Sequence, residues 1–498
     1  MKFSNGVLVL LLLSVFRSVG FSIPVYDDNL NIRQAHQYLY ALRPSSAEKI
    51  LKAEEIKNPG NGYVTFYRFY SEIIRLTISN SPEQYRKSLP GLKEYVRKLE
   101  ILPDNAPDYR LLLGEAKVYS GLLNVKYNSK LGGMLECLKG YNLLKDNAKK
   151  YPLFEPGKKI TGIIQISVAF MPKILRWGIK LLGIKSDPRG GLKELADYSK
   201  YAKGKPGYEE EAFLFTMAAY KLMNQDEEAM HLIREKSKDF KEIALLNYIA
   251  ATICLEANDT ETTLLLLSNI KPEKLEIPFP PLLYLTGKAK LFRLDPDANI
   301  PLINYLNTSA GTDYIKATLY DLACFYIISG NIPEYQNYTA QVKTKGRELH
   351  NRDIEAAFEA SKSDLPNIHL MRADLLVRGG YFRKAEDELS NIGDENAINN
   401  NEKVRFYYDS GECKRQRKLI RQAESAFLKA VALGNNTGDY IAQKALVESG
   451  LMMEKNGFTP EAIKYYNLCL QFKAVINPYS DLYNNKAKAG LIRLSLSE

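Results

Sequence analysis

Histidine, cysteine and carboxylate side chains carry most enzyme chemistry, and in this chain they form no recognisable catalytic or metal-binding pattern. The sequence has no HExxH zinc motif, no CxxC pair, no GxxxxGK[ST] phosphate loop and no GxSxG nucleophile motif. Asp187 directly precedes Pro188, so we expect a helix N-cap there rather than a catalytic carboxylate. The four histidines stand apart, at His36, His231, His350 and His369. We therefore predict that the protein is not an enzyme and carries no cofactor and no metal.

The five cysteines predict no chemistry either. They are odd in number and widely spaced, which is not the pattern of a disulfide framework. Cys254 and Cys324 stand in apolar stretches of helical character, where a buried free thiol is the usual arrangement.

Seven side chains in the second half of the chain have types suited to polar peptide recognition, because tyrosine and arginine are enriched where proteins bind partners. We expect them on the first helices of consecutive helix pairs, which line the concave groove of a helical repeat protein. The alternative is that these side chains are merely solvated. The seven residues are Tyr320, Asp374, Arg405, Tyr408, Glu412, Arg415 and Lys444.

The elements that would position these residues are three aligned repeats in the C-terminal third. Each has a small residue in its first helix, a second small residue twelve positions later, and Leu389, Phe427 or Tyr466 four positions further on. Small side chains let two antiparallel helices approach closely, and the large one fills the remaining gap. Units of about 34 residues with this pattern are typical of tetratricopeptide repeats. The small pairs are Ala373 with Ala385, Gly411 with Ala423, and Gly450 with Ala462.

The same spacing continues upstream with less regularity, through Ala218, Ala251, Gly287 and Ala323. Earlier still, turn residues at 58–62 and 103–108 separate helices, and we expect Ser45 and Ser46 to cap another helix. The prediction is an all-α, tetratricopeptide-like helix-pair solenoid. Its expected parts are a signal peptide at 1–20, a divergent helical region at 24–200, degenerate repeats at 208–340, an insertion at 341–366, and three clear repeats with a capping helix at 367–496.

The stretch 162–192 bears on whether the chain contacts a membrane. Its apolar run is about 12 residues, shorter than the roughly 20 that a spanning helix needs. Beyond Pro172, the basic residues Lys173, Arg176 and Lys180 recur at a spacing that places them on one helix face. A buried helical hairpin is the expected arrangement. The alternative is a helix on the membrane surface, with these three residues contacting anionic lipid.

The same stretch contains a series of matching features: Gly162, Met171 with Pro172, the helix ILRWGIKLLGI, Gly183, Asp187, Arg189, Gly191 and Leu192. This series resembles a signature of the tetratricopeptide repeat protein 39 family, which includes the yeast inclusion-body-clearance protein. The resemblance implies a helical N-terminal region followed by repeats. The export signal described next is a departure from the family, whose eukaryotic members act on the cytosolic side, so the cellular role does not transfer.

The first 20 residues read as a secretory signal. Lys2 precedes a ten-residue apolar run that ends at Phe16, and small residues at Ser18 and Gly20 permit a cut before Phe21. An uncleaved anchor is the alternative, and Arg17 disfavours it. No cysteine stands near the cut, so a lipoprotein is not expected. We predict an exported protein in the periplasm or envelope of a Gram-negative, Bacteroidetes-like bacterium.

The net charge of +10 is unevenly spread, because residues 21–200 carry a balance of +11 and residues 201–498 one of −3, and the basic N-terminal part favours an acidic partner or an anionic surface. The alternative is a solvated basic face. Dispersed lysines without a recognition module argue against nucleic acid, and no small-molecule substrate is evident. We expect a scaffold that binds a protein or peptide in its groove. The alternative function is a peripheral envelope-membrane protein whose basic N-terminal part contacts anionic lipid or an acidic partner.

Overall fold

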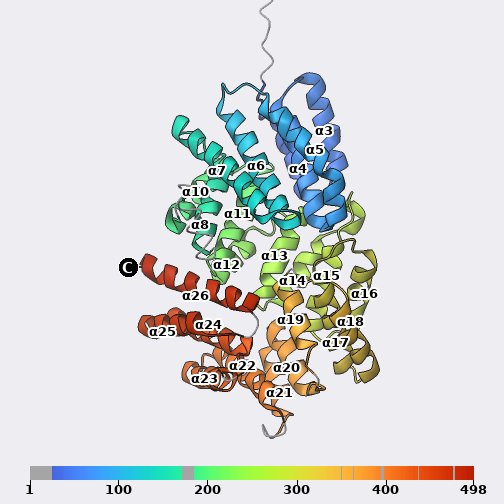
Figure 1. Ribbon diagram of the computed structural model, residues 1–498, viewed down its shortest axis with the longest axis vertical. Coiled ribbons are helices and arrows are strands. Elements are labelled where there is room, and N and C mark those ends of the chain that lie inside the picture. Colours follow the sequence, from blue (N-terminus) through green and yellow to red (C-terminus); the bar gives the residue numbers. More distant parts are fainter. Residues whose placement is uncertain are drawn as a thin grey trace, which may run out of the picture.

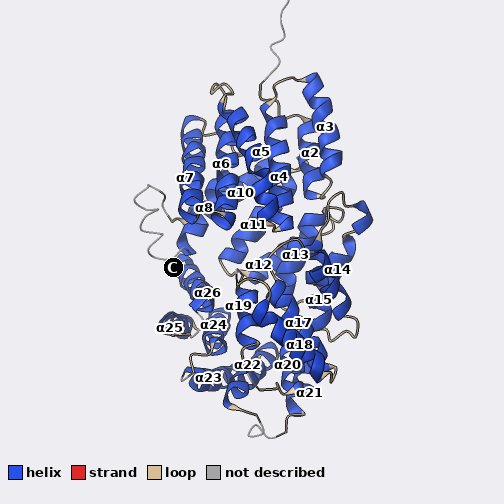
Figure 2. Cartoon of the chain, turned by 45° about the vertical axis from the view of Figure 1, so that its right-hand side comes forward, coloured by secondary structure: helices blue, strands red, loops and turns tan. Residues whose placement is uncertain are grey.

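The computed structural model describes residues 25–170, 184, 186–348, 350–362, 364–393, 398–435, 437–474 and 477–497. Throughout these residues the regular structure is helical, and they contain no strand (Figure 2). Successive helices pack as antiparallel pairs, and the pairs stack into a solenoid (Figure 1). The predicted all-α helix-pair solenoid is confirmed.

The first part of the chain consists of helix pairs as well. α2 packs on α3, α4 on α5, α6 on α7 and α8 on α10, so the helix-pair arrangement begins near the start of the described chain. The helices are α2 (Leu30–Tyr40), α3 (Pro44–Lys57), α4 (Gly62–Ser79), α5 (Pro82–Glu100), α6 (Pro107–Tyr127), α7 (Lys130–Lys150), α8 (Lys158–Phe170) and α10 (Pro188–Ala202).

Two glycines on each helix bring α6 and α7 into backbone contact. A Cβ added to Gly133 would lie 2.5 Å from the carbonyl oxygen of Gly121, and one added to Gly121 would lie 2.7 Å from that of Gly133. Gly114 and Gly140 face each other in the same way farther along the pair. Only residues without a Cβ permit this approach, so the pair depends on its glycines.

The middle and C-terminal parts continue the series, with pairs from α11 and α12 onward. The middle helices are α11 (Tyr208–Leu222), α12 (Asp226–Lys236), α13 (Ala244–Glu256), α14 (Thr260–Asn269), the 3₁₀ turn η1 (Pro272–Lys274), α15 (Pro280–Phe292), α16 (Asn299–Thr308), α17 (Ile315–Ile328) and α18 (Ile332–Thr344). The C-terminal helices are α19 (Asn351–Glu359), α20 (Ile368–Gly379), α21 (Phe382–Ser390), α22 (Asn400–Gln416), α23 (Ile420–Asn435), α24 (Tyr440–Lys455), α25 (Thr459–Gln471) and α26 (Asn477–Ser497).

The small residues of the three clear repeats lie where the two helices of each repeat approach closely, as the sequence pattern predicts. An added Cβ at Gly411 would lie 2.5 Å from the ring of Phe427, and one at Gly450 would lie 2.5 Å from the ring of Tyr466. Gly490 of α26 meets the other side of the Tyr466 ring, so this tyrosine fills the gap to the next helix. The four alanines at the other small positions are fully buried, at Ala373, Ala385, Ala423 and Ala462.

Upstream the pattern holds unevenly. Ala251 and Ala323 are fully buried, and Gly287 packs against Leu302 of the partner helix. In α11 the fully buried alanine is Ala219 and not Ala218, which is only half-buried. The solenoid therefore extends upstream of the clear repeats, but the marker residue in α11 lies one position from the predicted one.

The helices around the 162–192 stretch pack as a tight pair. Gly162 of α8 and Gly191 of α10 face each other so closely that a Cβ on either would lie within 2.8 Å of the other's carbonyl oxygen. Asp187 accepts a hydrogen bond from the backbone N–H of Gly190 at 2.9 Å, which confirms the predicted N-cap. The predicted N-cap at Ser45 and Ser46 is wrong, because α3 begins at Pro44 and its cap residue, Arg43, makes no side-chain cap bond. Ser46 instead donates its backbone N–H to Glu276 at 2.9 Å.

The C-terminal helix closes the solenoid on itself (Figure 1). Ala489 of α26 packs with Ile166 of α8 and Ala219 of α11. The Arg493 guanidinium binds the Glu454 carboxylate at 2.7 Å and donates to the carbonyl oxygens of Met223 and Asn224, at the end of α11. The described helices from α11 to α26 thus form a ring.

Candidate functional site: the concave cavity

The ring encloses a cavity of about 1020 Å³. Its walls come from the segment between α11 and α14, from α19, and from the first helices of the C-terminal pairs, α20, α22 and α24, with α26 closing one side. A concave space of this size, lined by apolar and polar side chains, is the usual form of a binding site.

The structure brings six of the seven predicted groove residues to the wall of this one cavity: Asp374, Arg405, Tyr408, Glu412, Arg415 and Lys444. Tyr320 lines a smaller adjoining pocket, together with Asp374 and Arg405. The alternative that these side chains are merely solvated is wrong for three of them, since Asp374, Tyr408 and Glu412 are 6% exposed or less. Their part in partner binding stays a prediction.

Helix α19 occupies one half of the groove and was not predicted as a helix, because it lies within the expected insertion at 341–366. Its Glu355 binds the Arg378 guanidinium of α20 at 2.9 Å, and its Glu359 binds Arg405 of α22 at 2.9 Å. The Tyr440 hydroxyl of α24 donates to both carboxylates, at 3.2 and 3.0 Å.

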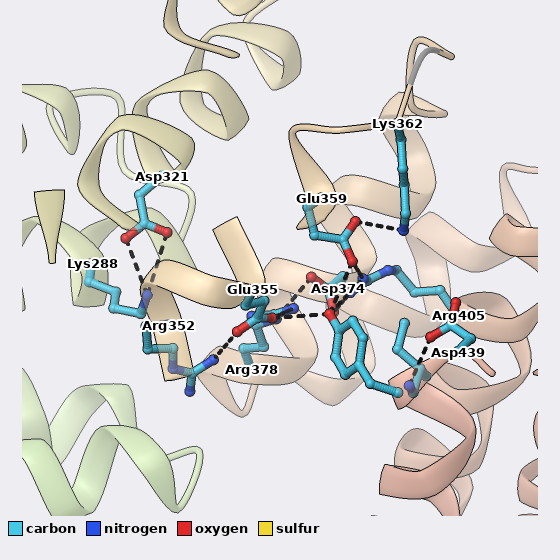
Figure 3. A network of polar contacts seen from close by, with 12 residues as sticks. Lys288, Asp321, Arg352, Glu355, Glu359, Lys362, Asp374, Arg378, Arg405 and Asp439 are labelled. Carbon is cyan, nitrogen blue, oxygen red and sulfur yellow. Dashed lines mark hydrogen bonds and ion pairs between the residues drawn. The ribbon is translucent and has the colours of Figure 1, made fainter. Parts of the chain in front are cut away.

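Asp374 joins these contacts into one continuous chain of charges (Figure 3). It binds Arg378 at 2.9 Å and Arg405 at 2.7 Å, while Arg352 and Lys362 of the α19 segment pair with Glu355 and Glu359. Burial opposes ionisation of the Glu359 carboxyl, but Arg405 and Lys362 outweigh it and lower the pKa. We call this chain the groove network: Arg352, Glu355, Glu359, Lys362, Asp374, Arg378, Arg405 and Tyr440.

The other half of the groove faces the open cavity. The Lys444 ammonium lies 4.4 Å from the centre of the Tyr408 ring, and Arg415 binds Glu412 at 2.6 Å. Burial, and then the nearby Arg378, lower the pKa of Lys444. A lysine with a lowered pKa gains from an added negative charge, because an anion restores its favourable charged state.

Asp409 is an unusual neighbour of this half. It is fully buried on α22, and neither of its carboxylate oxygens has a hydrogen-bond partner. Burial, and then the carboxylate of Asp374, raise the pKa of Asp409 well above its ordinary value, so its surroundings disfavour the ionised form.

Sequence reasoning missed Arg378, Glu355, Glu359 and Tyr440. Arg378 has a local signal, because it stands four residues after Asp374 and so shares its helix face. The two glutamates have the same spacing of four within a segment interpreted as an insertion, so no repeat position pointed to them.

A second cluster of buried charges lies in the N-terminal half. The Lys159 ammonium is 2.8 Å from both Glu115 and Glu211, and Glu211 also accepts the Tyr198 hydroxyl at 2.6 Å. His36 packs beside them against four tyrosine rings. Burial raises the pKa of Glu115 to about 7 and lowers that of His36 to about 4. We call His36, Glu115, Lys159 and Glu211 the Lys159 cluster. Each is 3% exposed or less, which leaves no room for a substrate.

Two predicted features, the membrane-surface helix and the signal peptide, fall on parts of the chain that the structure does not describe. The candidate lipid contacts Lys173, Arg176 and Lys180, like the signal peptide at 1–20, lie outside the described residues. Among the described helices, none combines the length and apolar character needed to cross a bilayer. The described residues contain no group of three or more His, Cys, Asp or Glu side chains placed to hold a metal ion. The five cysteines carry free thiols, and Cys254 and Cys324 are buried as expected.

Comparisons with known proteins were made at the level of family, sequence and structure. No family model and no curated protein matches the sequence. Among solved structures, the chain is similar to one in a structure of Naa15/Naa10 bound to HypK-THB, with 14% identity over 94% of this chain and 79% of that chain. The TM-score is 0.19, so this similarity supports no inference about site or partner.

Proposed function

We propose that this chain is an exported, non-enzymatic repeat scaffold that holds a protein or peptide partner in the cavity of its ring. The observation that carries the proposal is the convergence of Asp374, Arg405, Tyr408, Glu412, Arg415 and Lys444 on one cavity of about 1020 Å³. The open half offers charged groups of both signs, with the Lys444 ammonium held over the buried Tyr408 ring, which suits a peptide with polar side chains.

Export and the family likeness are parts of the proposal that rest on sequence. The signal at 1–20 supports an envelope or periplasmic site, and the resemblance of 162–192 supports kinship with the tetratricopeptide repeat protein 39 family. The close contact of Gly162 with Gly191 supports that resemblance, because it gives two of the matched positions a physical requirement.

The test is site-specific photo-crosslinking in the living source cells. A photoreactive residue at position 444 or 415 is expected to give discrete protein adducts, which mass spectrometry identifies. The same residue at position 83, exposed on α5 far along the chain, is the control. Equal adducts from positions 83 and 444, or none from 444 and 415, would reject the cavity as the binding site.

A substitution series complements the crosslinking. Made in the chain without a photoreactive residue, Lys444→Met and Arg415→Gln are each expected to weaken the affinity for the identified partner at least about tenfold without unfolding the chain, since one contact of this kind is worth roughly 1.4 kcal/mol or more. Tyr408→Ala is unsuitable here, because Tyr408 is buried against Phe427 and its loss would destabilise the core.

A further inference from the structure

Helix α19 lies where a repeat scaffold binds its ligands. It packs on α17, and its side chains contact α20, α22 and α24. These four are the first helices of their repeats, the set that lines the concave face. A segment of the chain itself thus fills half of the groove, and Figure 3 shows its acidic residues among the guanidinium groups of the inner helices.

The contacts of α19 with the groove are mostly charged. Glu355 and Glu359, four residues apart on one helix face, meet Arg378, Arg405 and the Tyr440 hydroxyl. Between them lies Phe358, whose ring is edge-on to Tyr440 at 5.9 Å between centroids. We call this surface under α19, formed by Arg378, Arg405 and Tyr440, its seat. The seat therefore matches a short helical pattern in which acidic residues flank an aromatic one.

Apolar packing holds α19 only weakly. Its fully buried side chains on the α17 side are small, Ala356 and the following Ala360, whereas Ile354 and Phe358 are only partly buried. Asp353 adds a polar anchor by accepting the backbone N–H groups of Tyr314 and Ala317 at 2.9 and 3.0 Å. A helix of nine residues is not stable by itself in water, so α19 depends on this seat to remain helical.

The stretches on either side of α19 are exposed to solvent. Residues 343–348 before it are exposed without interruption, as are Asp364 and Leu365 after it. Release of α19 would therefore expose little of these two stretches, although it would break the ion pair of His350 with Asp313 at 2.8 Å.

We propose that the seat of α19 is a binding surface for an acidic amphipathic helix of a partner protein, and that α19 occupies it in cis as a competing internal ligand. The partner helix presents the pattern of α19, an aromatic residue with carboxylates one position after it and three before it. This inference rests on the proposed function and names the chemical class of its partner. Leaving the seat empty is unfavourable, because Arg378 and Arg405 would share the single carboxylate of Asp374.

The probe is a synthetic, fluorescein-labelled peptide with the sequence of residues 350–362, added to the full chain. In the double variant Glu355→Gln, Glu359→Gln the cis helix loses the two carboxylates that face Arg378 and Arg405, while those arginines stay in place. We expect this variant to bind the peptide at least about tenfold more tightly than the wild type, by fluorescence anisotropy, because the tethered competitor is weakened. A peptide with the same two glutamines is expected not to bind.

Hydrogen–deuterium exchange supplies the second readout. Exchange at residues 351–359 should rise in the double variant and in 0.5 M salt, while residues 368–471 keep their protection. The matched control is Glu83→Gln, Glu94→Gln, which removes two glutamate ion pairs on the exposed face of α5 and should change neither readout. If the double variant fails to fold, Glu359→Gln alone is expected to give a smaller rise of the same kind.

Unchanged exchange at 351–359 in a folded variant, together with peptide affinity no better than that of the wild type, would overturn the inference and make α19 a fixed wall of the groove. The proposed scaffold function survives that outcome, because the crosslinks at positions 444 and 415 report on the open half. Loss of those crosslinks with a positive peptide result would instead place the partner on the seat of α19 alone.

Discussion

The Lys159 cluster and the groove network both place several charges inside the protein, and they differ in their access to solvent. The four members of the Lys159 cluster come from α2, α6, α8 and α11 and are 3% exposed or less. The groove network alternates carboxylates with guanidinium groups along the wall of a cavity of about 1020 Å³. Similar ion pairs thus occur in a site closed to solvent, the Lys159 cluster, and in one beside a cavity, the groove network.

The difference teaches how to separate structural charges from functional ones. In the sealed site no water or ligand can replace a lost partner, so each group depends on the others for the stability of the fold. Beside a cavity, water can solvate a group whose partner leaves, and an incoming ligand can take the place of that partner. The predictions below compare the two sites in order of decreasing effect on stability.

Removing the central cation of the sealed site is expected to have the largest effect. Lys159→Met leaves Glu115 and Glu211 buried without their cation, and we expect a loss of about 3–5 kcal/mol in the free energy of unfolding. Urea denaturation measures it. Lys149→Met, at an exposed ion pair with Asp146, is the control and should cost less than about 0.5 kcal/mol. Similar values for both variants would break the comparison.

The sealed site should also show a distinctive pH dependence through Glu115. Burial raises the pKa of this carboxyl from 4.5 to about 7, so the folded protein retains a proton that the unfolded chain releases. This contribution to stability is complete below about pH 4.5 and is lost as the pH rises through 7. Glu115→Gln removes it.

The measurement for Glu115 is the difference in unfolding free energy between wild type and Glu115→Gln from pH 4 to 7.5. We expect the wild type to lose its advantage by on the order of 3 kcal/mol across this range. His36, whose pKa is lowered to about 4, contributes with the opposite sign but is present in both proteins and cancels. A difference that stays flat with pH would show that Glu115 is ionised in the folded protein.

In the groove network the expected loss is intermediate. Arg405→Gln removes the guanidinium shared by Glu359 and Asp374, which then turn toward cavity water and their remaining partners. We expect a cost of about 1.5–3 kcal/mol by urea denaturation, less than for Lys159→Met. A loss as large as that of Lys159→Met would mean that the groove is as sealed as the N-terminal cluster.

The smallest effect on stability is expected at the open end of the cavity. Lys444→Met gives up a cation–π contact with Tyr408 but also relieves the burial that lowers the pKa of the lysine. These terms oppose each other, so the free energy of unfolding should change by less than about 1 kcal/mol. Thermal unfolding compared with the wild type measures this change. A large loss of stability would show that Lys444 is part of the buried core.

The fold was accessible from the sequence because its signals are local and repeated. Gly411, Gly450 and the fully buried alanines are required by close helix contacts, and a pattern that recurs three times can be recognised without a structure. The cavity lining was accessible for the same reason, since the repeat spacing defines which face of each first helix points inward.

The two charge clusters were not accessible in the same way. Lys159 forms ion pairs with Glu115 and Glu211, which are 44 and 52 positions away in the sequence, and no local sequence pattern predicts such long-range pairs. The single hint is a lysine directly before an apolar run, at Lys159 and Ile160. Helix α19 escaped prediction because it breaks the repeat spacing and because its stability comes from its seat rather than from its own sequence.

Closure of the ring by Arg493 sets a limit on how this architecture can change. An open solenoid can gain or lose a helix pair at little cost, because each pair contacts only its neighbours. Here the last helix reaches back to the carbonyl groups of Met223 and Asn224, so adding or removing a pair between α11 and α26 would move Arg493 away from them. The number of repeats, and with it the aperture of the cavity, is therefore fixed as a whole rather than repeat by repeat.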